Sequence, residues 1–252
     1  MSDLLEVLPP RWREDRMMLA DRPRWDAMEV HGDGDGLVLV FPGRRGPVLL
    51  GRGDPGTVGR VLEQIDVGHV GWLSVPRGCD VAPDVLARLG LVPYSTWDWL
   101  SSSTPPPVSD AEAAVVRLDP GADADAIRGC LAVANPSTSA DPTAPDEAGW
   151  WGIRVDGRLA GVVGAAVRGG PDAGHSWHVH GLGVVPELRG TGSGTALAAA
   201  VTRAGLASGA AWVSLGMYAD NDVARRIYER LGYRVDARFT SFSPRGATRP
   251  PG

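Results

Sequence analysis

The chain has 252 residues, of which 43% are hydrophobic and 22% are charged, and its formal net charge is −5. This composition is typical of a globular protein with one large domain or two modest ones, and the negative balance argues against a nucleic-acid partner. All 25 basic residues are arginine, which excludes mechanisms that need a lysine, such as a Walker-type phosphate loop or a Schiff base.

The N-terminal stretch carries acids and prolines where a signal peptide needs basic residues and an apolar core. The longest apolar run, at 159–167, is too short to span a bilayer. Cys79 and Cys130 lie far apart and form no metal-ligand pair, so we expect two buried thiols in a reducing compartment. Together these features predict a cytoplasmic protein with no metal and no membrane partner.

In the first half of the chain, the pattern predicts a strand at 71–75, a helix at 80–90 and an aromatic-rich strand at 94–100. The stretch SSSTPPPVSD that follows is polar, rich in proline and without apolar periodicity, which is typical of a linker. We therefore expect four segments: a first domain at 1–104, a linker at 105–110, a second domain at 111–244 and a disordered tail at 245–252.

In the second half, strands and helices alternate. We expect a strand at 114–118, a helix at 123–134, a hairpin at 149–170 that turns at Asp156-Gly157, a strand at 175–185, a helix at 191–209, a strand at 211–219, a helix at 221–232 and a strand at 233–243. Strands outnumber helices and several are joined as hairpins. The fold class is therefore α/β, with a mixed, mostly antiparallel sheet flanked by helices.

One helix of the first half is similar to one of the second. Residues 80–90 (DVAPDVLARLG) match residues 222–232 (DVARRIYERLG) at 6 of 11 positions. In both places a strand with a tryptophan precedes the helix and an aromatic-rich strand follows it. Chance similarity of one short helix is the alternative, but the shared flanks favour two tandem copies of one fold.

Three glycines at alternate positions, Gly190, Gly192 and Gly194, separate the strand at 175–185 from the next helix. A strand, a glycine-rich turn and a helix form a general device for holding a phosphate, because bare backbone N–H groups and the helix N-terminus face the anion. The missing lysine excludes a Walker loop. The G-x-G-x-G spacing also differs from the G-x-G-x-x-G of dinucleotide-binding folds.

The stretch LGVVPELRGTGSGTAL, followed by NDVARRIYERLGY, resembles the two central motifs of the GNAT superfamily of acetyl-CoA-dependent N-acetyltransferases. The resemblance covers about 114–243. It implies the acyl-CoA N-acyltransferase fold, acetyl-CoA as co-substrate, and transfer of an acetyl group to a primary amine of a small molecule or peptide. The alternative is a catalytically silent module that binds coenzyme A or another protein.

By this resemblance, the pyrophosphate of the coenzyme lies against backbone N–H groups of the turn. These groups belong to Arg189, Gly190, Thr191, Gly192, Ser193 and Gly194. The strand before the turn splays from its neighbour and binds the pantetheine arm and thioester through Leu182, Gly183 and Val184, with the N–H of Val184 directed at the acetyl carbonyl. Asn221 is expected to cap the later helix and to face the cofactor.

Tyr228 matches the tyrosine that, in the family, hydrogen-bonds the coenzyme sulfur and protonates the departing thiolate. An aromatic side chain that only packs on the core is the alternative. The equivalent residue in the first half is Leu86, so an apolar group suffices where only packing is required. The first half also carries Asp54 and Pro55 in its turn, where a carboxylate would repel a phosphate. We therefore expect a degenerate copy there.

A base is needed because an ammonium group has no lone pair. His178 stands where several relatives carry a glutamate base, and strand alternation puts His178, His180 and Leu182 on one face. Either histidine suits proton removal near neutrality. Many relatives use a chain of waters instead, so a mechanism without a dedicated base stays open.

Acceptor specificity in the family comes from the loop after the first helix and from the late strands. Glu147, Trp151 and Tyr218 are therefore the candidates for binding the acceptor amine. Trp150 and Trp151 point to opposite faces of a strand, so we expect one of them in the core. A solvated loop is the alternative for the carboxylate. We expect a monomer or a homodimer.

Overall fold

The computed structural model describes residues 8–22, 28–43, 45–170 and 173–247. The chain forms two compact units that interleave in sequence. The first comprises Met1–Trp99, Tyr218–Asp220 and Asp236–Pro251, and the second comprises Leu100–Met217, Asn221–Val235 and Gly252. The main difference from the limits expected from sequence, 1–104 and 111–244, is that the end of the last strand belongs to the first unit. Of the expected tail, residues 248–252 lie outside the described residues.

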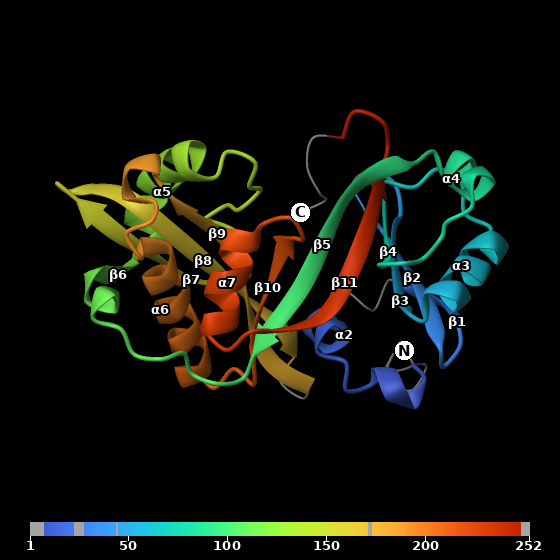
Figure 1. The fold of residues 1–252 in the computed structure, drawn as a ribbon, viewed down its shortest axis with the longest axis horizontal. Coiled ribbons are helices and arrows are strands. Elements are labelled where there is room, and N and C mark those ends of the chain that lie inside the picture. Colours follow the sequence, from blue (N-terminus) through green and yellow to red (C-terminus); the bar gives the residue numbers. More distant parts are fainter. Residues whose placement is uncertain (1–7, 23–27, 44, 171–172, 248–252) are drawn as a thin grey trace. The chain divides into compact units, whose positions relative to one another are not determined.

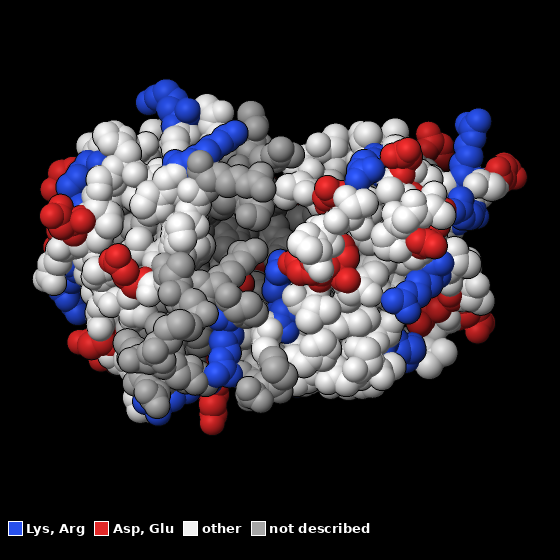
Figure 2. Space-filling view, turned by 180° about the vertical axis from the view of Figure 1, so that it is seen from behind, with Lys and Arg blue, Asp and Glu red and all other residues white. Residues whose placement is uncertain are grey.

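The surface carries charges of both signs. On the side drawn in Figure 2, acidic and basic side chains lie interspersed over the described residues. None of the described helices is long and apolar enough to cross a membrane.

The first unit is built on a sheet with antiparallel and parallel pairs (Figure 1). Its elements are α2 (Arg16–Ala20), β1 (Glu29–Gly32), β2 (Gly36–Phe41), β3 (Val48–Gly53), α3 (Pro55–Gln64), β4 (Trp72–Pro76), α4 (Pro83–Leu89) and β5 (Val92–Ser102) up to Trp99. β1 pairs antiparallel with β2 and β2 with β3, whereas β3 and β4 are parallel. The last strand of the chain, β11 (Arg234–Ser243), pairs antiparallel with β4, which is why it belongs to this unit.

The helices α3 and α4 bury their apolar sides in the core of the first unit. Val58 and Leu62 of α3, and Val85 and Leu89 of α4, are four residues apart in each helix and are all buried. Residues at this spacing lie on one side of a helix. They join one cluster with alternate residues of the strands, such as Leu49.

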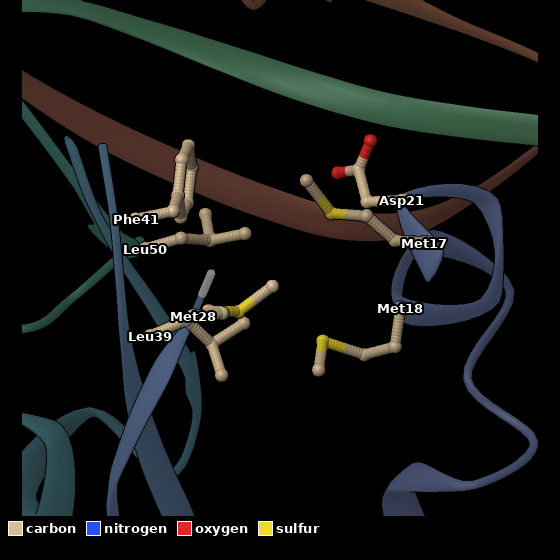
Figure 3. Close-up of a pocket in the computed structure, with 7 residues that line it drawn as sticks. All are labelled: Met17, Met18, Asp21, Met28, Leu39, Phe41 and Leu50. Atoms are coloured by element: carbon tan, nitrogen blue, oxygen red, sulfur yellow. The ribbon is translucent and has the colours of Figure 1, made fainter. Parts of the chain in front are cut away.

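The opposite face of β2 and β3 packs against α2. Figure 3 shows the side chains of Met17 and Met18 pointing from α2 toward Leu39 and Leu50, which face each other in the register of the two strands. Between them remains a cavity of about 10 Å³. Such a volume holds one water molecule at most, so this cavity is a small packing gap rather than a ligand site.

The second unit contains the expected alternation of strands and helices. Its elements are β6 (Val115–Leu118), α5 (Pro120–Ala134), β7 (Glu147–Val155), β8 (Arg158–Gly170), β9 (Ala173–Val184), α6 (Ser193–Ala207), β10 (Val213–Tyr218) up to Met217, and α7 (Asp222–Arg230). β6 to β9 pair antiparallel in sequence order, and β10 pairs parallel with β9. The mixed, mostly antiparallel sheet expected from sequence is confirmed.

Both faces of this sheet are buried. Trp151 and Val163 face a cluster that includes residues of α6 and α7, which lie side by side in Figure 1. Trp150 and Val162 face the opposite way and pack against Ile127 of α5. The alternation of neighbouring strand residues produces these two cores. It also decides to which face each candidate site residue belongs.

The expected linker is an extended segment without helix or strand at 103–109. It is attached to the second unit by Arg203 of α6, which donates hydrogen bonds to the carbonyls of Pro106 (3.0 Å) and Pro107 (3.3 Å). The same guanidinium pairs with Glu112 at 3.2 Å. This segment is therefore held along the second unit.

The two halves of the chain share an order of elements. In the first half of the chain, β1–β2–β3–α3–β4–α4–β5 follows the short helix α2, and in the second half, β7–β8–β9–α6–β10–α7–β11 follows α5. In both, the first three strands are antiparallel and the third and fourth are parallel. This correspondence supports the tandem arrangement inferred from the sequence.

Candidate active site

The glycine turn connects β9 to α6. Gly190 (φ +78°) and Gly192 (φ +90°) both adopt the left-handed region, which a residue with a Cβ enters only with strain. Nothing lies within 4 Å of the position that a Cβ would occupy at either residue. The two glycines are thus required by backbone conformation, and the space above them is open. Gly194 has no such φ, and a Cβ there would make only an ordinary contact with Val184 at 3.7 Å.

The N-terminus of α6 has no side-chain cap. Gly192 is the N-cap residue, no side chain accepts a hydrogen bond from the first N–H groups, and the first turn contains no acidic residue. The other described α-helices of eight or more residues are capped by Asp54, Asp119 and Asn221. Because the first N–H groups of a helix have no intrahelical partner, α6 presents free donors and partial positive charge beside the turn.

Side chains of the turn fix its shape. Arg189 donates from Nε to the carbonyl of Val184 at 3.2 Å, which anchors the turn to the end of β9. The hydroxyl of Thr191 donates to the carbonyl of Leu188 at 2.8 Å, and the same oxygen lies at hydrogen-bond distance, 2.8 Å, from Ser193 Oγ. Arg189, Thr191 and Gly192 are exposed, so the backbone of the turn is accessible.

The strand β9 bulges and then separates from β10. Gly181 has φ +61°, and the register with β8 shifts there, between Val162 and Gly164. Pairing between β9 and β10 ends at Val179 with Leu215, although both strands continue. This is the splay that the sequence resemblance implied. A glycine inside a strand is a known signal for a bulge, so Gly181 is the sequence feature that marks this one.

The end of β9 directs backbone groups toward the splay. Val185 donates to the carbonyl of Ala160 at 2.9 Å, and Val184 faces Gly161 across the ladder. In an antiparallel ladder, alternate residues bond to the neighbour, so the N–H of Val184 points away from β8. Its carbonyl accepts from Arg189, and that of Leu182 accepts from Asn135 at 3.2 Å.

The bulge corrects one expectation from the sequence. Simple alternation placed His178, His180 and Leu182 on one face, which is wrong because the extra residue at Gly181 reverses the alternation beyond it. Leu182 packs with the cluster of α6 and α7, whereas His180 lies against Trp150 on the α5 face. Gly183 lies on the α5 side as well, where a Cβ would come within 2.9 Å of Ala134.

Tyr228 is buried on the side of α6 and α7. Its side chain is 7% exposed and contacts the ring of Tyr233 edge-to-face at 5.5 Å between centroids. Burial raises the pKa of Tyr228 to about 12, so the phenol is protonated at neutral pH. Tyr233 also has its pKa raised by burial, and its hydroxyl lies 2.7 Å from that of Thr202.

The two histidines of β9 have different partners. His178 Nδ1 lies 3.0 Å from the hydroxyl of Ser214, which donates to the carbonyl of Trp177 at 3.2 Å. His180 Nε2 lies 2.9 Å from Oε1 of Glu147. Both histidines are on the α5 face, because they pair with Ala166 and Gly164 of β8. Sequence reasoning singled out both rings but missed Ser214, whose position becomes relevant only through the β9–β10 register.

The acceptor candidates separate in the structure. Trp151 lies in the core, with 7% exposure and its ring 5.8 Å from that of Trp177, so it has no free face for a ligand. Trp150 is the residue beside Glu147 and His180, but it is fully buried too. The structure therefore gives the acceptor candidate Trp151 no exposed face, because both faces of this sheet are covered.

Two further candidates lie at the ends of elements. Asn221 caps α7 by accepting from the N–H of Ala224 at 3.0 Å, as expected, and is exposed. Tyr218, the last residue of β10, is 42% exposed and belongs to the first compact unit. Burial, followed by the neighbouring Tyr94, raises the pKa of Tyr218.

A hollow of about 710 Å³ opens on the α5 side of the second unit. It is lined by α5, the β7–β8 hairpin and the turn at Val185–Leu188, and contains none of the candidate site residues. Cys130 lies at its base, and burial raises the pKa of this thiol. The thiolate, which is the reactive form, is therefore disfavoured.

Comparisons with known proteins agree with this geometry. Residues 121–233 match the model of the Acetyltransferase (GNAT) family. A GCN5-related N-acetyltransferase from Kribbella flavida has a TM-score of 0.58 at 20% identity, over 94% of this chain and 95% of that one. One from Sphaerobacter thermophilus has a TM-score of 0.56 at 16% identity, over 87% and 82%.

An acetyltransferase of the GNAT family from Colwellia psychrerythraea has a TM-score of 0.53 at 13% identity, over 94% of this chain and 90% of that one. At such identities the likeness concerns the fold, and it extends over nearly the whole chain. The match to the family model covers α5 to α7, the stretch that contains the glycine turn, the splay and Tyr228. The match to the GNAT acetyltransferase family thus concerns residues 121–233, and the likeness of fold extends beyond them.

Proposed function

We propose that the second unit transfers the acetyl group of acetyl-CoA to a primary amine by direct attack. The single observation that carries this proposal is the uncapped N-terminus of α6, with Gly190 and Gly192 in the left-handed region before it and open space above them. An anion with several oxygens fits such a cradle of backbone donors. The diphosphate of coenzyme A is that anion.

The fit extends along β9. The N–H of Val184 faces the splay, so it can donate to the carbonyl oxygen of the thioester as negative charge develops there. A donor of this kind contributes about 3–4 kcal/mol to the stability of a transition state. Leu182 and Gly183 lie on the same stretch of strand and are proposed to border the pantetheine arm. Asn221, at the start of α7, is proposed to face the cofactor.

Proton transfers complete the reaction. The attacking nitrogen must lose two protons, one before it attacks and one as the amide forms. The first goes to a base on the α5 face and from there to solvent. The coenzyme sulfur takes the proton of the Tyr228 phenol as it departs. Tyr228 then regains a proton from the nitrogen, which is the second proton that the nitrogen loses. The phenol of Tyr228 is protonated at neutral pH and can therefore donate, and the role is proposed from its place in the family motif.

The acceptor is proposed to be a small molecule or a peptide that enters on the α5 face. His178 and His180 are the two candidate bases on that face. Glu147 lies beside them, and Tyr218 remains a proposed contact of the acceptor. The first unit is proposed to be a degenerate copy without chemistry of its own. A cytoplasmic monomer or homodimer fits these proposals.

Thiol release from acetyl-CoA in the presence of an amine library tests the activity. We expect release that depends on at least one amine, with the acetylated product visible by mass spectrometry. Isothermal titration with coenzyme A is the second arm. Binding without transfer would indicate a silent coenzyme A-binding module, and no binding would remove the proposed function altogether.

A further inference from the structure

We propose that Glu147 is a positioning residue for His180, and that His180 is the group that removes the proton of the acceptor amine. This inference rests on the proposed function. Glu147 comes from the start of β7 and His180 from β9, with β8 between them. Glu147 Oε1 and His180 Nε2 are nevertheless only 2.9 Å apart. The two side chains therefore reach toward each other across a strand.

The buried carboxylate of Glu147 requires a charged or hydrogen-bonding partner, and the imidazole of His180 is close enough to be one. The side chain of Glu147 is 9% exposed, and its Oε2 has no hydrogen-bond partner among the described residues. A carboxylate that is removed from water loses its hydration and requires a paired charge or a donor. The ring of His180 lies within ion-pair distance of this carboxylate. Both ring nitrogens are buried, and neither has a hydrogen-bond partner of normal geometry among the described residues. In the proposed arrangement Nε2 carries the proton and faces the carboxylate, which leaves the lone pair on Nδ1.

The surroundings hold the ring of His180 in place. It packs edge-to-face on Trp150, with 5.4 Å between the ring centroids, and Trp150 is fully buried. A Cβ on Gly164 of the strand between them would lie 2.6 Å from His180 and 2.7 Å from Trp150. Glycine at this position thus makes room for both rings. About a fifth of the His180 side chain is exposed, but both ring nitrogens are buried, so an acceptor amine must reach Nδ1 from within the site rather than from open solvent.

The position of the two histidines along β9 favours His180 over His178 as the base. His180 directly precedes the bulge at Gly181 and lies beyond the last rung shared with β10, Val179 with Leu215. His178 lies within the paired stretch, with Nδ1 on Ser214. The histidine held by a carboxylate is therefore the one nearest the splay. A carboxylate that orients a histidine and stabilises its protonated form is a known arrangement for a base.

The step balances in atoms and charge. An N–H bond of the acceptor ammonium breaks, its electron pair remains on nitrogen, and the proton forms a bond to His180 Nδ1. The resulting imidazolium keeps its Nε2–H on Glu147, whose charge stabilises it. The free pair on nitrogen then forms a bond to the thioester carbon, and the C–S bond breaks with its electron pair on sulfur. The sulfur takes a proton from Tyr228, which regains one from the nitrogen, and His180 later returns its proton to solvent.

Long-range ¹H–¹⁵N NMR of the histidine rings tests the pair without any need for activity. The signals of His180 are identified by their loss in His180→Gln. In the wild-type protein we expect the proton on Nε2 and the lone pair on Nδ1. Glu147→Gln should remove this preference, whereas the matched control Asp146→Asn should keep it, because Asp146 pairs with Arg168 at 2.5 Å instead. A proton on Nδ1 in the wild type would overturn the proposal.

Kinetics with an accepted amine test the role. His180→Gln should lower kcat by roughly 10²–10⁴-fold, and Glu147→Gln by roughly 10–100-fold, with the KM for acetyl-CoA unchanged. Wild-type kcat in either variant, or an effect on KM alone, would contradict the role. If the wild-type protein acetylates no amine, the proposed function fails, and the NMR result still decides whether Glu147 holds His180.

Discussion

The helices α3 and α6 are equivalent, because each follows the third strand in the order of elements that the two halves of the chain share. Their N-termini differ. At α3, Oδ1 of Asp54 accepts hydrogen bonds from the N–H (2.8 Å) and the hydroxyl (3.0 Å) of Thr57. At α6, the N-cap is Gly192, and no side chain accepts. One helix satisfies its first donors with its own carboxylate, and the other leaves them for a ligand.

The same contrast recurs at the next helix. Leu86 of α4 and Tyr228 of α7 stand at equivalent positions in the two matching segments; Tyr228 is buried in the core of its unit, and Leu86 is partly buried against the core of the other. The apolar residue shows that packing alone does not require a phenol there. The two differences together support the proposal that the first unit is a degenerate copy, which has the fold but not the groups proposed to bind and react.

The strongest test of this contrast gives α6 the carboxylate that α3 has. Gly192→Glu should abolish acetyl-CoA binding, because a carboxylate would occupy the free donors and repel the diphosphate. Isothermal titration measures this. The control Gly209→Glu places the same residue just after α6, at φ +93° and also in open space. It should bind acetyl-CoA as the wild type does, and equal affinity in both variants would contradict the site.

Removal of the phenol tests the second difference. Tyr228→Phe should lower kcat by roughly 10²–10⁴-fold with little change in cofactor affinity, because only the proton donor is lost. The matched control is Tyr233→Phe, which removes a buried hydroxyl bonded to Thr202. That change should cost stability, by about 1–3 kcal/mol, and should spare kcat. If Tyr228→Phe has the turnover of the wild type, the phenol of Tyr228 has no catalytic role and the side chain only packs in the core.

Removal of the carboxylate from α3 should affect stability and leave cofactor binding unchanged. The hydrogen bonds from Thr57 lower the pKa of Asp54 below 3.8, so its contribution to stability is present at neutral pH and is lost as the pH falls through that lowered pKa. Thermal unfolding of Asp54→Ala should show a fall in Tm on the order of a few degrees at pH 7. The difference from wild type should shrink below pH 4. A difference in Tm that stays the same at every pH would show that the ionised carboxylate of Asp54 is not what stabilises the helix.

The smallest effect is expected at Gly194, the second residue of α6. Its backbone needs no glycine, and a Cβ would contact only Val184 at 3.7 Å. Gly194→Ala should therefore raise stability by about 0.5–1 kcal/mol and weaken acetyl-CoA binding modestly. Unfolding and titration of the same preparation measure both. Unchanged affinity would mean that the ligand does not approach this residue.

Local patterns were sufficient to predict much of the fold. The turn at Asp156-Gly157, the cap at Asn221 and the alternation of strands and helices depend on neighbouring residues, which a sequence displays directly. The turn of glycines was predictable for the same reason. Its backbone conformation, with Gly190 and Gly192 in the left-handed region, is a local property as well.

Features that depend on register were not predictable. One extra residue at Gly181 changes the face on which Leu182 lies, and the sequence does not show where β8 and β9 slip past each other. The pair of Glu147 and His180 arises from the same register, across strands separated by more than thirty residues. The burial of Trp151 follows from helices on both faces of the sheet, which strand periodicity does not reveal.

A crystal structure of the protein with acetyl-CoA tests the central claim most directly. We expect the diphosphate against the backbone N–H groups of residues 190–194, and the thioester carbonyl beside the N–H of Val184. A diphosphate bound elsewhere, with this turn empty at saturating acetyl-CoA, would contradict the account.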